Sequence, residues 1–460
     1  MGEDGAVGEV MWFRRDLRRR DNPALGAAAA GGAVIPLVVL DPALLGQRPR
    51  DAAYLRAVAG LHEELDGHLV IRTGDPAQVL PEICAATGAR VVHVSAEVTP
   101  GGRRRDQRVR EALQENGIGW AETGCPYAVC PGQVRTASGT GYQVFTPFAR
   151  AWNDLGWRAP AQLPRQTRWA TGIESDPVPE PSLPAGASHT AITEAEARAR
   201  WAAYQEQLLA GYAGRRDRAD LDATSRLSTA LKLGTVHPRT LLHDLARQTS
   251  EPRATDRFRT ELAWREFYAD VLWRHPKSAW HDLRPALARL EYDEPRRDPQ
   301  ARQRLDAWRA GRTGFPLVDA GMRQLLTEGW MHNRVRMVVA SFLVKDLHLR
   351  WQHGARHFLD HLSDGDLAAN SHGWQWVSGT GTDAAPYFRI FNPITQAKTA
   401  DPDGDYVRRY VPQLRHLLGP AALEPWRTPD GHAHGYPERI VDHAHERAES
   451  LARYDAARRA

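Results

Sequence analysis

Residues 361–393 mix acidic and amide side chains with bulky aromatic ones, in the order HLSDGDLAANSHGWQWVSGTGTDAAPYFRIFNP. A packed core has little use for such a mixture, because buried polar groups cost free energy unless each finds a partner. Two interpretations are open: a loop whose polar residues are solvated, or a site where acids and an amide bind a ligand beside aromatic rings. The side chains concerned are Asp364, Asp366, Asn370, Trp374 and Trp376.

A second segment just upstream, residues 313–347, has the same character. Asn333, Arg334 and Arg336 stand there inside an apolar pattern of helical period. Two neighbouring segments that both place polar side chains among apolar ones indicate one shared, buried ligand rather than two solvated loops.

Two shorter motifs add groups that could contact a ligand. In ELAWREFY, the three-and-four spacing puts Glu261 and Tyr268 on one face of a predicted helix, with Trp264 or Arg265 between them. TSRLS, residues 224–228, supplies hydroxyls and backbone N–H groups just ahead of a predicted helix, where phosphates bind well. Taken alone, the same run is also an ordinary helix N-cap.

The elements that must position these residues begin with alternating strands and helices over residues 8–130. Short apolar runs are separated by predicted helices at 51–66 and 76–87. Near-continuous apolar strands between helices predict a parallel sheet that is covered on both faces. The apolar runs are Val10–Phe13, Val34–Leu40, Leu69–Arg72 and Arg90–Val94.

The composition changes after about residue 130. Residues 160–190 are rich in proline, serine, threonine and glycine, which is typical of a linker, and almost everything after Ala195 has helical period. We therefore predict a Rossmann-like α/β domain with a parallel five-stranded sheet, then a long linker and an all-helical domain. The predicted ranges are 1–130, 131–195 and 196–460.

The first strand of this sheet runs into FRRDLRRRDN, which has none of the glycines of a dinucleotide-binding turn. The glycines at Gly379 and Gly381 also fail that fingerprint, because a third glycine and a preceding strand are missing. The α/β domain is therefore not expected to bind a dinucleotide in the usual way.

The overall composition limits the classes of partner and compartment. Lys plus Arg is 60 against 56 for Asp plus Glu, so a net charge of +4 is small and nucleic-acid binding would need a local basic patch. Neither a signal peptide nor a membrane-spanning run is recognisable. Three cysteines, Cys84, Cys125 and Cys130, are too few for a disulfide framework and favour a reducing cytoplasm.

No metal site is expected. Cys125 and Cys130 have no second Cys or His pair at ligand spacing. The histidines near the end of the chain lack acidic or Cys partners in the sequence and are expected at the surface; they are His432, His434, His443 and His445.

Several long motifs, in order, resemble the photolyase/cryptochrome family, in particular its class I cyclobutane pyrimidine dimer photolyases. Those in the second half are ELAWREFY, GWMHNRVRM, ASFLVKDL, DGDLAAN, GWQW and TGTDAAPYFRIFNP. FRRDLRRRDNPAL, YQVFTPFARAW and TSRLS extend the resemblance over nearly the whole chain. It implies light-driven repair of cyclobutane pyrimidine dimers in DNA, by electron transfer from excited reduced FAD to a flipped-out dimer.

By resemblance, FAD is held by residues from five segments of the helical domain. Arg336 is expected to pair with Asp364 beside the isoalloxazine, and the amide of Asn370 is expected to face the flavin N5 and favour a fully reduced anionic flavin. The full set is Tyr212, Thr224, Ser225, Arg226, Leu227, Ser228, Glu261, Arg265, Asn333, Arg336, Asp364, Asp366 and Asn370.

The resemblance also implies a hole that receives the flipped dimer. Trp264 and Trp376 would offer apolar faces to its two rings, and a base must leave the duplex before chemistry on it can occur. Glu261, in an apolar site, is expected to stay protonated and donate a hydrogen bond to a thymine carbonyl. The lesion-contacting set is Glu261, Trp264, Asn333, Met337 and Trp376.

The partner implied is double- or single-stranded DNA that contains pyrimidine dimers, bound by a monomer in the cytoplasm. Residues expected at the basic rim of the hole are Arg216, Arg265, Arg334, Arg389 and Gln396. The family's electron-hopping tryptophans correspond to Trp374 beside the flavin, then Trp351, then Trp308 as the exposed end.

A second, antenna chromophore is implied in or beside the α/β domain. TPGGRRRDQRV, residues 99–109, favours 8-hydroxy-5-deazaflavin over methenyltetrahydrofolate. However, the arginine that the family has before the helix at 51–66 is replaced by Asp51, with Arg50 one place early, so loss of the antenna is also open.

Three other functions compete with dimer repair. A (6-4) photolyase would have histidines where this chain has Asn333 and Met337. A cryptochrome-type photoreceptor without repair would keep the flavin but usually lose the pocket residues or add a C-terminal extension. A flavin-free DNA-binding module would show no visible absorbance.

Overall fold

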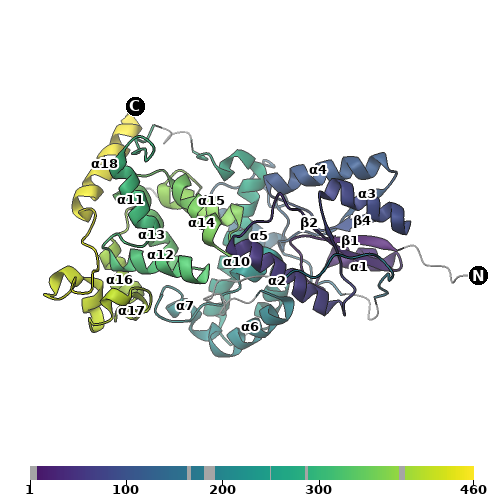
Figure 1. Cartoon of the computed structure of the whole chain (residues 1–460), viewed down its shortest axis with the longest axis horizontal. Coiled ribbons are helices and arrows are strands. Elements are labelled where there is room, and N and C mark those ends of the chain that lie inside the picture. The colour runs from purple at the N-terminus through teal and green to yellow at the C-terminus, as the bar shows by residue number, and fades with distance from the viewer. Residues whose placement is uncertain are drawn as a thin grey trace, which may run out of the picture.

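Five parallel strands form the sheet of the N-terminal region, which confirms the predicted fold class (Figure 1). In the computed structural model, the described residues are 8–162, 167–180, 192–248, 250–284, 289–382 and 389–459. The elements of this region are β1 (Glu9–Phe13), α1 (Pro23–Ala30), β2 (Val34–Leu40), α2 (Pro49–Glu64), β3 (Val70–Thr73), α3 (Pro76–Thr87), β4 (Val91–Val94), α4 (Pro100–Glu115) and β5 (Gly119–Glu122).

The strand order is β3-β2-β1-β4-β5. The chain adds β2 and β3 on one side of β1 and then returns to add β4 and β5 on the other side, so the switch point of the sheet lies between β1 and β4. Alternate residues of β1 enter two different cores because side chains on a strand point to opposite faces. Met11 and Phe13 pack with residues of α1 and α2, whereas Val10 and Trp12 pack with residues of α3 and α4. Helices therefore cover both faces, as the apolar strands predict.

The loop between β1 and α1 explains why its sequence has arginines and aspartates where a nucleotide-binding turn has glycines. The loop is buried against the helical region, with Arg18 donating to the Gly234 carbonyl at 3.0 Å. Asp21 forms an ion pair with Arg239 at 2.7 Å. These side chains hold the two regions together rather than bind a phosphate.

The predicted linker crosses back over the α/β region. It begins with a regular helix, α5 (Phe145–Leu155). Farther along, Val34 donates to the Arg168 carbonyl at 2.8 Å and Asp176 donates to the Ile71 carbonyl at 2.7 Å. The segment 167–180 therefore lies along β2 and β3 before the chain enters the helical region.

The helical region contains the remaining helices and short turns (Figure 1). The longest is α10, whose proline at the first position suits a helix start. The elements are α6 (Glu194–Gln207), η2 (Leu209–Gly211), α7 (Tyr212–Arg215), α8 (Ser228–Leu233), α9 (Pro238–Arg247), α10 (Pro252–Arg274), η3 (Pro276–Ala279), α11 (Pro299–Arg309), α12 (Pro316–Glu328), α13 (Asn333–Ser341), η5 (Phe342–Asp346), α14 (Trp351–His361), α15 (Leu367–Ser378), α16 (Pro393–Ala400), α17 (Asp405–Tyr410), η6 (Pro412–Leu414), η7 (Gly419–Leu423), η8 (Pro425–Arg427) and α18 (His443–Arg459).

Two expectations about cysteine and histidine are wrong. Cys125 and Cys130 form a disulfide, because a tight local loop brings their Cα atoms to 5.9 Å, while Cys84 is free and buried. His443 is buried and bonds to Asp346, since the last helix packs against η5 instead of standing in solvent. Within the described residues, no helix is both long and apolar enough to cross a membrane.

Candidate functional site

Helix α15 begins at the acidic motif because Asp366 is its N-cap. The Asp366 carboxylate accepts a hydrogen bond from the Ala369 backbone at 3.0 Å, which satisfies one of the free N–H groups of the first turn. Asp364 lies two residues earlier and forms a bidentate pair with Arg336 of α13, at 2.8 and 3.2 Å. The predicted Arg336–Asp364 pair is therefore present, and both acids are buried.

Two cations near Asp366, Arg15 and Lys232, were missed by the sequence reasoning. Arg15, in the loop after β1, contacts the Asp366 carboxylate at 2.8 Å. Its Nε also donates to the Lys232 carbonyl in α8 at 3.3 Å. Arg15 belongs to the FRRDLRRRDN motif, but only the docking of the two regions brings it to the acid.

The charges around Asp366 are unbalanced in favour of cations. Burial would raise the pKa of Asp366, but Arg15 and Arg265 outweigh it and the pKa is lowered. Burial and the neighbouring Arg15 lower the pKa of Lys232 to about 8. No ion pair of the Lys232 ammonium occurs within the described residues, so an anionic ligand would supply the missing counter-charge.

The TSRLS segment lies where the sequence predicts, at the start of α8, but its residues differ in burial and in their contacts. Leu227 is buried and Ser228 is exposed at the start of the helix. Arg200 holds the Ser225 carbonyl at 3.1 Å and the Thr224 carbonyl at 3.4 Å. Since α8 has only six residues, hydroxyls and backbone N–H groups would contribute more to phosphate binding than a helix dipole would.

The side chain of Arg226 in this segment is engaged within the protein. Its guanidinium lies 4.2 Å from the ring centroid of Trp330 and pairs with Asp222 at 2.8 Å. The backbone at Arg226 has a φ of 51°, a left-handed conformation that is unfavourable for this residue type. The side chain thus fixes the turn, and the predicted contact of Arg226 with the cofactor would be through its backbone.

The residues present fit FAD. Asn370 donates its Nδ2 to the Ala355 carbonyl at 3.0 Å, which leaves Oδ1 as an acceptor with no donor among the residues that the structure describes. An acceptor there suits a ligand N–H, buried acids suit ligand hydroxyls, and Lys232 suits a pyrophosphate. Tyr212, another predicted cofactor contact, is buried beside Phe258, and this position is compatible with FAD binding.

The expectation of an apolar environment around Glu261 is wrong. The carboxylate is half-buried on α10 and accepts a hydrogen bond from Arg216. Arg257, one turn earlier, lies 3.4 Å away. The three-and-four spacing of Arg257 and Glu261 was visible in the sequence. Arg216 comes from the turn after α7, far away in the sequence, so its contact was not visible. The condition that the protonation hypothesis required is absent.

The other predicted lesion contacts line a partly open surface. Trp264 and Trp376 are half-buried on α10 and α15, which pack against each other. Asn333 is exposed and Met337, one turn later on α13, is half-buried. Aromatic, amide and thioether groups that remain accessible suit a ligand that arrives from solvent.

The predicted basic rim divides into free and engaged arginines. Arg216 and Arg334 both contact Asp217, at 3.5 and 2.7 Å, so part of their charge is already neutralised. Arg389 is exposed, and no ion pair of its side chain occurs within the described residues. Gln396 of α16 is half-buried; residues 383–388, just before Arg389, lie outside the described residues.

Arg265 faces inward rather than toward the rim. Its guanidinium donates to the Pro126 carbonyl at 3.0 Å and the Leu231 carbonyl at 2.8 Å. It also lies 4.3 Å from the ring centroid of Tyr127. The position of Arg265 is therefore compatible with its predicted role on the cofactor side. It does not support the predicted contact of Arg265 with DNA.

The expectation that Trp308 is the exposed end of a tryptophan chain is also wrong. Trp308 is fully buried, its indole donates to the Val339 carbonyl at 3.0 Å, and its ring lies 6.1 Å from Trp374. Ala301, Leu305 and Trp308 form the helical-period stripe that α11 buries, a signal that could have revealed this.

Trp351 is buried too, with its indole donating to Asp282 at 2.6 Å. Trp374 packs directly on Gly354, one turn after Trp351 in α14; a Cβ there would lie 2.1 Å from the Trp374 ring. All three tryptophans are near one another in the core, and none of them reaches the surface.

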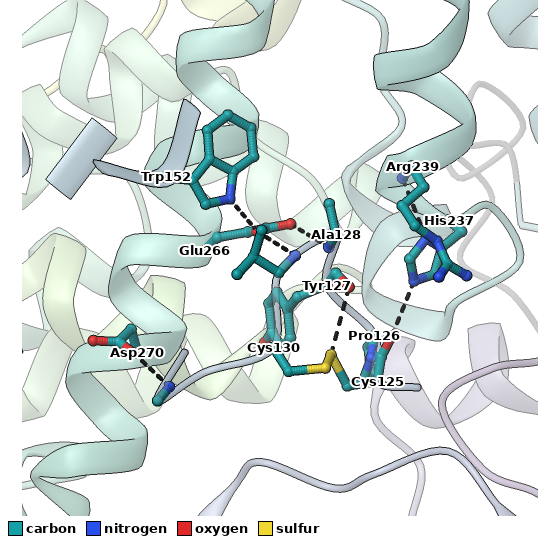
Figure 2. The surroundings of a disulfide bond; sticks show 12 residues. Cys125, Pro126, Tyr127, Ala128, Cys130, Trp152, His237, Arg239, Glu266 and Asp270 are labelled. Carbon is teal, nitrogen blue, oxygen red and sulfur yellow. Dashed lines mark hydrogen bonds between the residues drawn. A yellow bond between two sulfur atoms is a disulfide. The ribbon is translucent and has the colours of Figure 1, made fainter. Parts of the chain in front are cut away.

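Glu266 and Asp270 of α10 meet the disulfide loop, and Glu266 also meets Trp152 of α5 (Figure 2). Glu266 accepts hydrogen bonds from the backbone of Ala128 and Val129 and from the indole of Trp152, at 2.5, 3.0 and 2.6 Å. Asp270, one turn on, accepts from the Gly132 backbone at 2.6 Å. Sequence reasoning missed both acids, which fix the position of α10.

At the switch point of the sheet, polar groups gather outside the carboxyl ends of β1 and β4, where open α/β sheets bind ligands. Arg14 bonds to Asp106 at 2.5 Å and to the Ser95 carbonyl. The Oδ2 atom of Asp16 and the Nε1 atom of Trp12 are buried without a hydrogen-bond partner among the described residues. Buried polar atoms that lack a partner are groups that a ligand could satisfy.

The residues at the start of α2, where an antenna arginine was sought, are engaged elsewhere. Asp51 accepts hydrogen bonds from the Gly46 backbone and from Arg48, at 3.1 and 2.7 Å. Arg50 donates to the Leu359 carbonyl in the helical region at 2.9 Å. Neither side chain is free to take over the role of that arginine.

Comparisons with known proteins agree with this arrangement. A family model described as DNA photolyase matches residues 9–166, and one described as the FAD binding domain of DNA photolyase matches residues 258–456. The chain is 40% identical over 470 residues to the deoxyribodipyrimidine photo-lyase of Streptomyces griseus, with 98% of both chains covered. It is 37% identical over 477 residues to that of Escherichia coli, covering 98% of this chain and 99% of the relative.

Solved structures show the same fold. A bacterial class III photolyase from Agrobacterium tumefaciens superposes with a TM-score of 0.91 at 33% identity, over 100% of this chain and 99% of the other. A cryptochrome from Synechocystis gives a TM-score of 0.87 at 27% identity, over 97% and 98%. The similarity therefore extends over both regions of the molecule.

Proposed function

Because this chain belongs to the DNA photolyase family, we propose that it is a deoxyribodipyrimidine photo-lyase that repairs cyclobutane pyrimidine dimers in DNA with light and bound FAD. The curated relatives reported above carry that activity in their names, at 40% and 37% identity over almost their full length. The cryptochrome similarity is at lower identity and concerns the shared fold.

One observation carries the proposal: helix α13 contributes to both the buried and the open side of the site. Arg336 reaches the buried acid Asp364, on the side that fits the cofactor. Asn333 and Met337 share that face of α13 with Arg336 by the three-and-four spacing, and both remain accessible. A cofactor and a DNA base held along one face of the helix would be close enough for direct electron transfer.

The cofactor side binds and orients FAD. When bound and reduced, FAD supplies an electron on absorbing light. Asp366 would accept from ligand hydroxyl or N–H groups, Lys232 would pair with the pyrophosphate, and Asn370 would present Oδ1 to the isoalloxazine edge. The amide of Asn370 is uncharged and cannot transfer a proton to the flavin as an acid would, which favours an anionic reduced flavin beside it.

The open side binds the extruded dimer. Trp264 and Trp376 would stack on its rings, at about 1–3 kcal/mol per base. Glu261 would not act alone, because Arg216 holds its carboxylate. In our proposal the Arg216–Glu261 pair contacts the dimer as a unit, with the guanidinium stabilising negative charge that develops on a thymine carbonyl.

The rim would contact the phosphates of damaged double- or single-stranded DNA, with the protein acting as a monomer. Arg389 is the best placed because it is exposed and unpaired among the described residues. Arg334 and Arg216 would contribute less, since each shares Asp217. A local patch of this kind is needed because the net charge is only +4.

Resupply of electrons to the flavin would run through Trp374, which touches Trp308 and packs on Gly354, one turn after Trp351 in α14. Because all three rings are buried, the exchange with an external reductant must occur at another group. Phenylalanine fills most of the volume of tryptophan but is much harder to oxidise, so Trp351→Phe and Trp308→Phe show by photoreduction rate which branch the electron takes.

We also propose that an antenna chromophore, 8-hydroxy-5-deazaflavin rather than methenyltetrahydrofolate, binds at the switch point of the sheet. The partnerless atoms of Asp16 and Trp12 support a ligand there. The engagement of Asp51 and Arg50 in other contacts weighs against the family's usual contact at α2. Absorbance of the protein reconstituted with each chromophore tests the choice.

The decisive experiment illuminates the reduced, FAD-loaded protein with blue light in the presence of ultraviolet-damaged oligothymidylate. We expect the dimers to be converted to intact thymines, with no conversion in the dark. Asp366→Ala is the matched variant, since it removes a buried acid of the cofactor side and should purify nearly colourless. Full FAD occupancy with normal affinity in both Asp364→Ala and Asp366→Ala would refute the cofactor placement, and absence of repair by loaded wild-type protein would refute the function.

A further inference from the structure

One face of the Trp264 indole is already covered by another aromatic ring. The centroids of Phe145 and Trp264 are 3.7 Å apart and their planes differ by 6°, so the two rings overlap almost completely. Phe145 is buried, whereas Trp264 is only half-buried. The accessible part of the indole therefore lies on the side away from Phe145.

The edges of the indole are packed as well. Phe267 meets Trp264 at a centroid distance of 5.8 Å and an angle of 73°, and Tyr268 meets it at 5.4 Å and 45°. Phe267 in turn contacts Phe145 at 5.8 Å. With a flat stack on one face and rings along its edges, the indole has one open face and little freedom to turn.

Phe145 itself is held rigidly, because it is the first residue of α5 and that helix is anchored to α10. Trp152 of α5 donates to Glu266 at 2.6 Å, and Phe148 packs on Phe267 at 5.1 Å. Both residues of α5 are fully buried. A segment that follows the α/β region thus delivers a fixed ring to a side chain of the helical region.

We propose that Phe145 is a positioning residue for lesion recognition, which fixes the Trp264 indole so that a pyrimidine ring stacks on its opposite face. This inference rests on the proposed function. A side chain that is already immobilised loses less entropy when a ligand stacks on it, so a preorganised platform binds more tightly than a mobile one. The gain applies only to a base that leaves the duplex, and it therefore raises the preference for damaged DNA.

The test measures binding in the dark to an oligonucleotide with one thymine dimer and to the same undamaged sequence. Phe145→Leu should weaken binding to the damaged DNA by about 3- to 10-fold, which corresponds to the entropy cost of immobilising one side chain. Binding to the undamaged DNA should not change. Phe145→Tyr keeps the stacked ring and should stay within about 2-fold of wild type. FAD absorbance should be the same in all of them.

Two controls separate positioning from general loss of structure. Phe148→Leu removes another buried ring of α5. Among the described residues, Phe148 has ring contacts with Tyr142 and Phe267 but none with Trp264, so this variant should lower the Tm without changing the preference for damaged DNA. In a double-mutant cycle, Phe145→Leu should cost nothing further in a Trp264→Ala background, because its effect passes through the indole.

The outcomes also distinguish the two proposals. If Trp264→Ala leaves the preference for damaged DNA intact, the lesion pocket is misplaced and the proposed function loses its binding site. If Trp264→Ala lowers the preference but Phe145→Leu does not, positioning by Phe145 is wrong. Tighter binding by Phe145→Leu would also overturn it, because Phe145 would then occupy the place of the lesion.

Discussion

Two glutamates on α10, five residues apart in one motif, have opposite surroundings. Glu266 is buried and accepts three N–H donors, from Ala128, Val129 and Trp152. Glu261 is half-buried and meets two arginines from the side of the predicted lesion pocket. The first glutamate has every partner it needs within the protein, whereas the second still presents part of its surface to solvent.

This difference shows how one helix serves both the fold and the site. A fully satisfied buried carboxylate fixes α10 against the disulfide loop and α5. A half-satisfied carboxylate beside an open aromatic face can rearrange its contacts when a ligand arrives. Polar residues in a single motif therefore cannot be assigned one common role.

The largest effect is expected from removing the satisfied member of the pair. Glu266→Ala leaves three N–H donors without an acceptor, and the two buried ones, on Val129 and Trp152, cost about 1–3 kcal/mol each, so the free energy of unfolding should fall by about 2–6 kcal/mol. Glu261→Ala should change it by about 1 kcal/mol or less. Urea denaturation of both variants measures the contrast, and equal losses would mean that the two faces of α10 do not differ as described.

The pH dependence of stability should sharpen the same comparison. Burial raises the pKa of Glu266 to about 7, although its backbone and Trp152 donors oppose the shift. Between pH 4.5 and 7 the folded state then binds more protons than the unfolded state, so the contribution of Glu266 to stability falls as pH rises through this window.

The variant Glu266→Gln provides the reference, since it lacks the titrating proton. The stability of wild type minus that of the variant should decrease from pH 4.5 to 7, by at most about 3 kcal/mol, and be flat above pH 7. A difference that increases over this range would show that the carboxylate is ionised in the fold well below pH 7.

On the open face, Trp264→Ala should leave FAD content nearly unchanged but weaken binding to dimer-containing DNA by about 1–3 kcal/mol, as loss of stacking would. Fluorescence anisotropy with damaged and undamaged oligonucleotides measures it. Glu261→Gln should bind damaged DNA well and repair it less efficiently, because the charged pair with Arg216 is weakened. Equal losses on the two DNAs would show that these residues do not recognise the lesion.

The smallest effect concerns the rim. Arg389→Ala should reduce the slope of log K against log salt concentration by about 1, as expected for one lost phosphate contact. Arg216→Ala should reduce it by less, since Glu261 and Asp217 already compensate its charge. An unchanged slope in Arg389→Ala would remove this residue from the DNA interface.

The amino-acid sequence by itself determined the fold class and most elements. Apolar runs of strand length between helices gave the parallel sheet, because burial on both faces leaves that pattern in the residues themselves. The resemblance of the motifs to the photolyase/cryptochrome family implied that Arg336 pairs with Asp364, and the structure contains this pair. The roles of the site residues toward FAD and DNA remain predictions.

Only the tertiary structure decided which charges meet. Arg15 reaches Asp366 across 351 positions of sequence, and Arg216 reaches Glu261 across 45 positions from the turn after α7, so no local pattern could indicate either contact. The burial of Trp308 is a different case, because Ala301, Leu305 and Trp308 form an apolar stripe of helical period in α11 that the expectation of an exposed Trp308 overlooked. Local periodicity encodes which face of an element is apolar, whereas the partner of each polar group depends on long-range packing that no single segment contains.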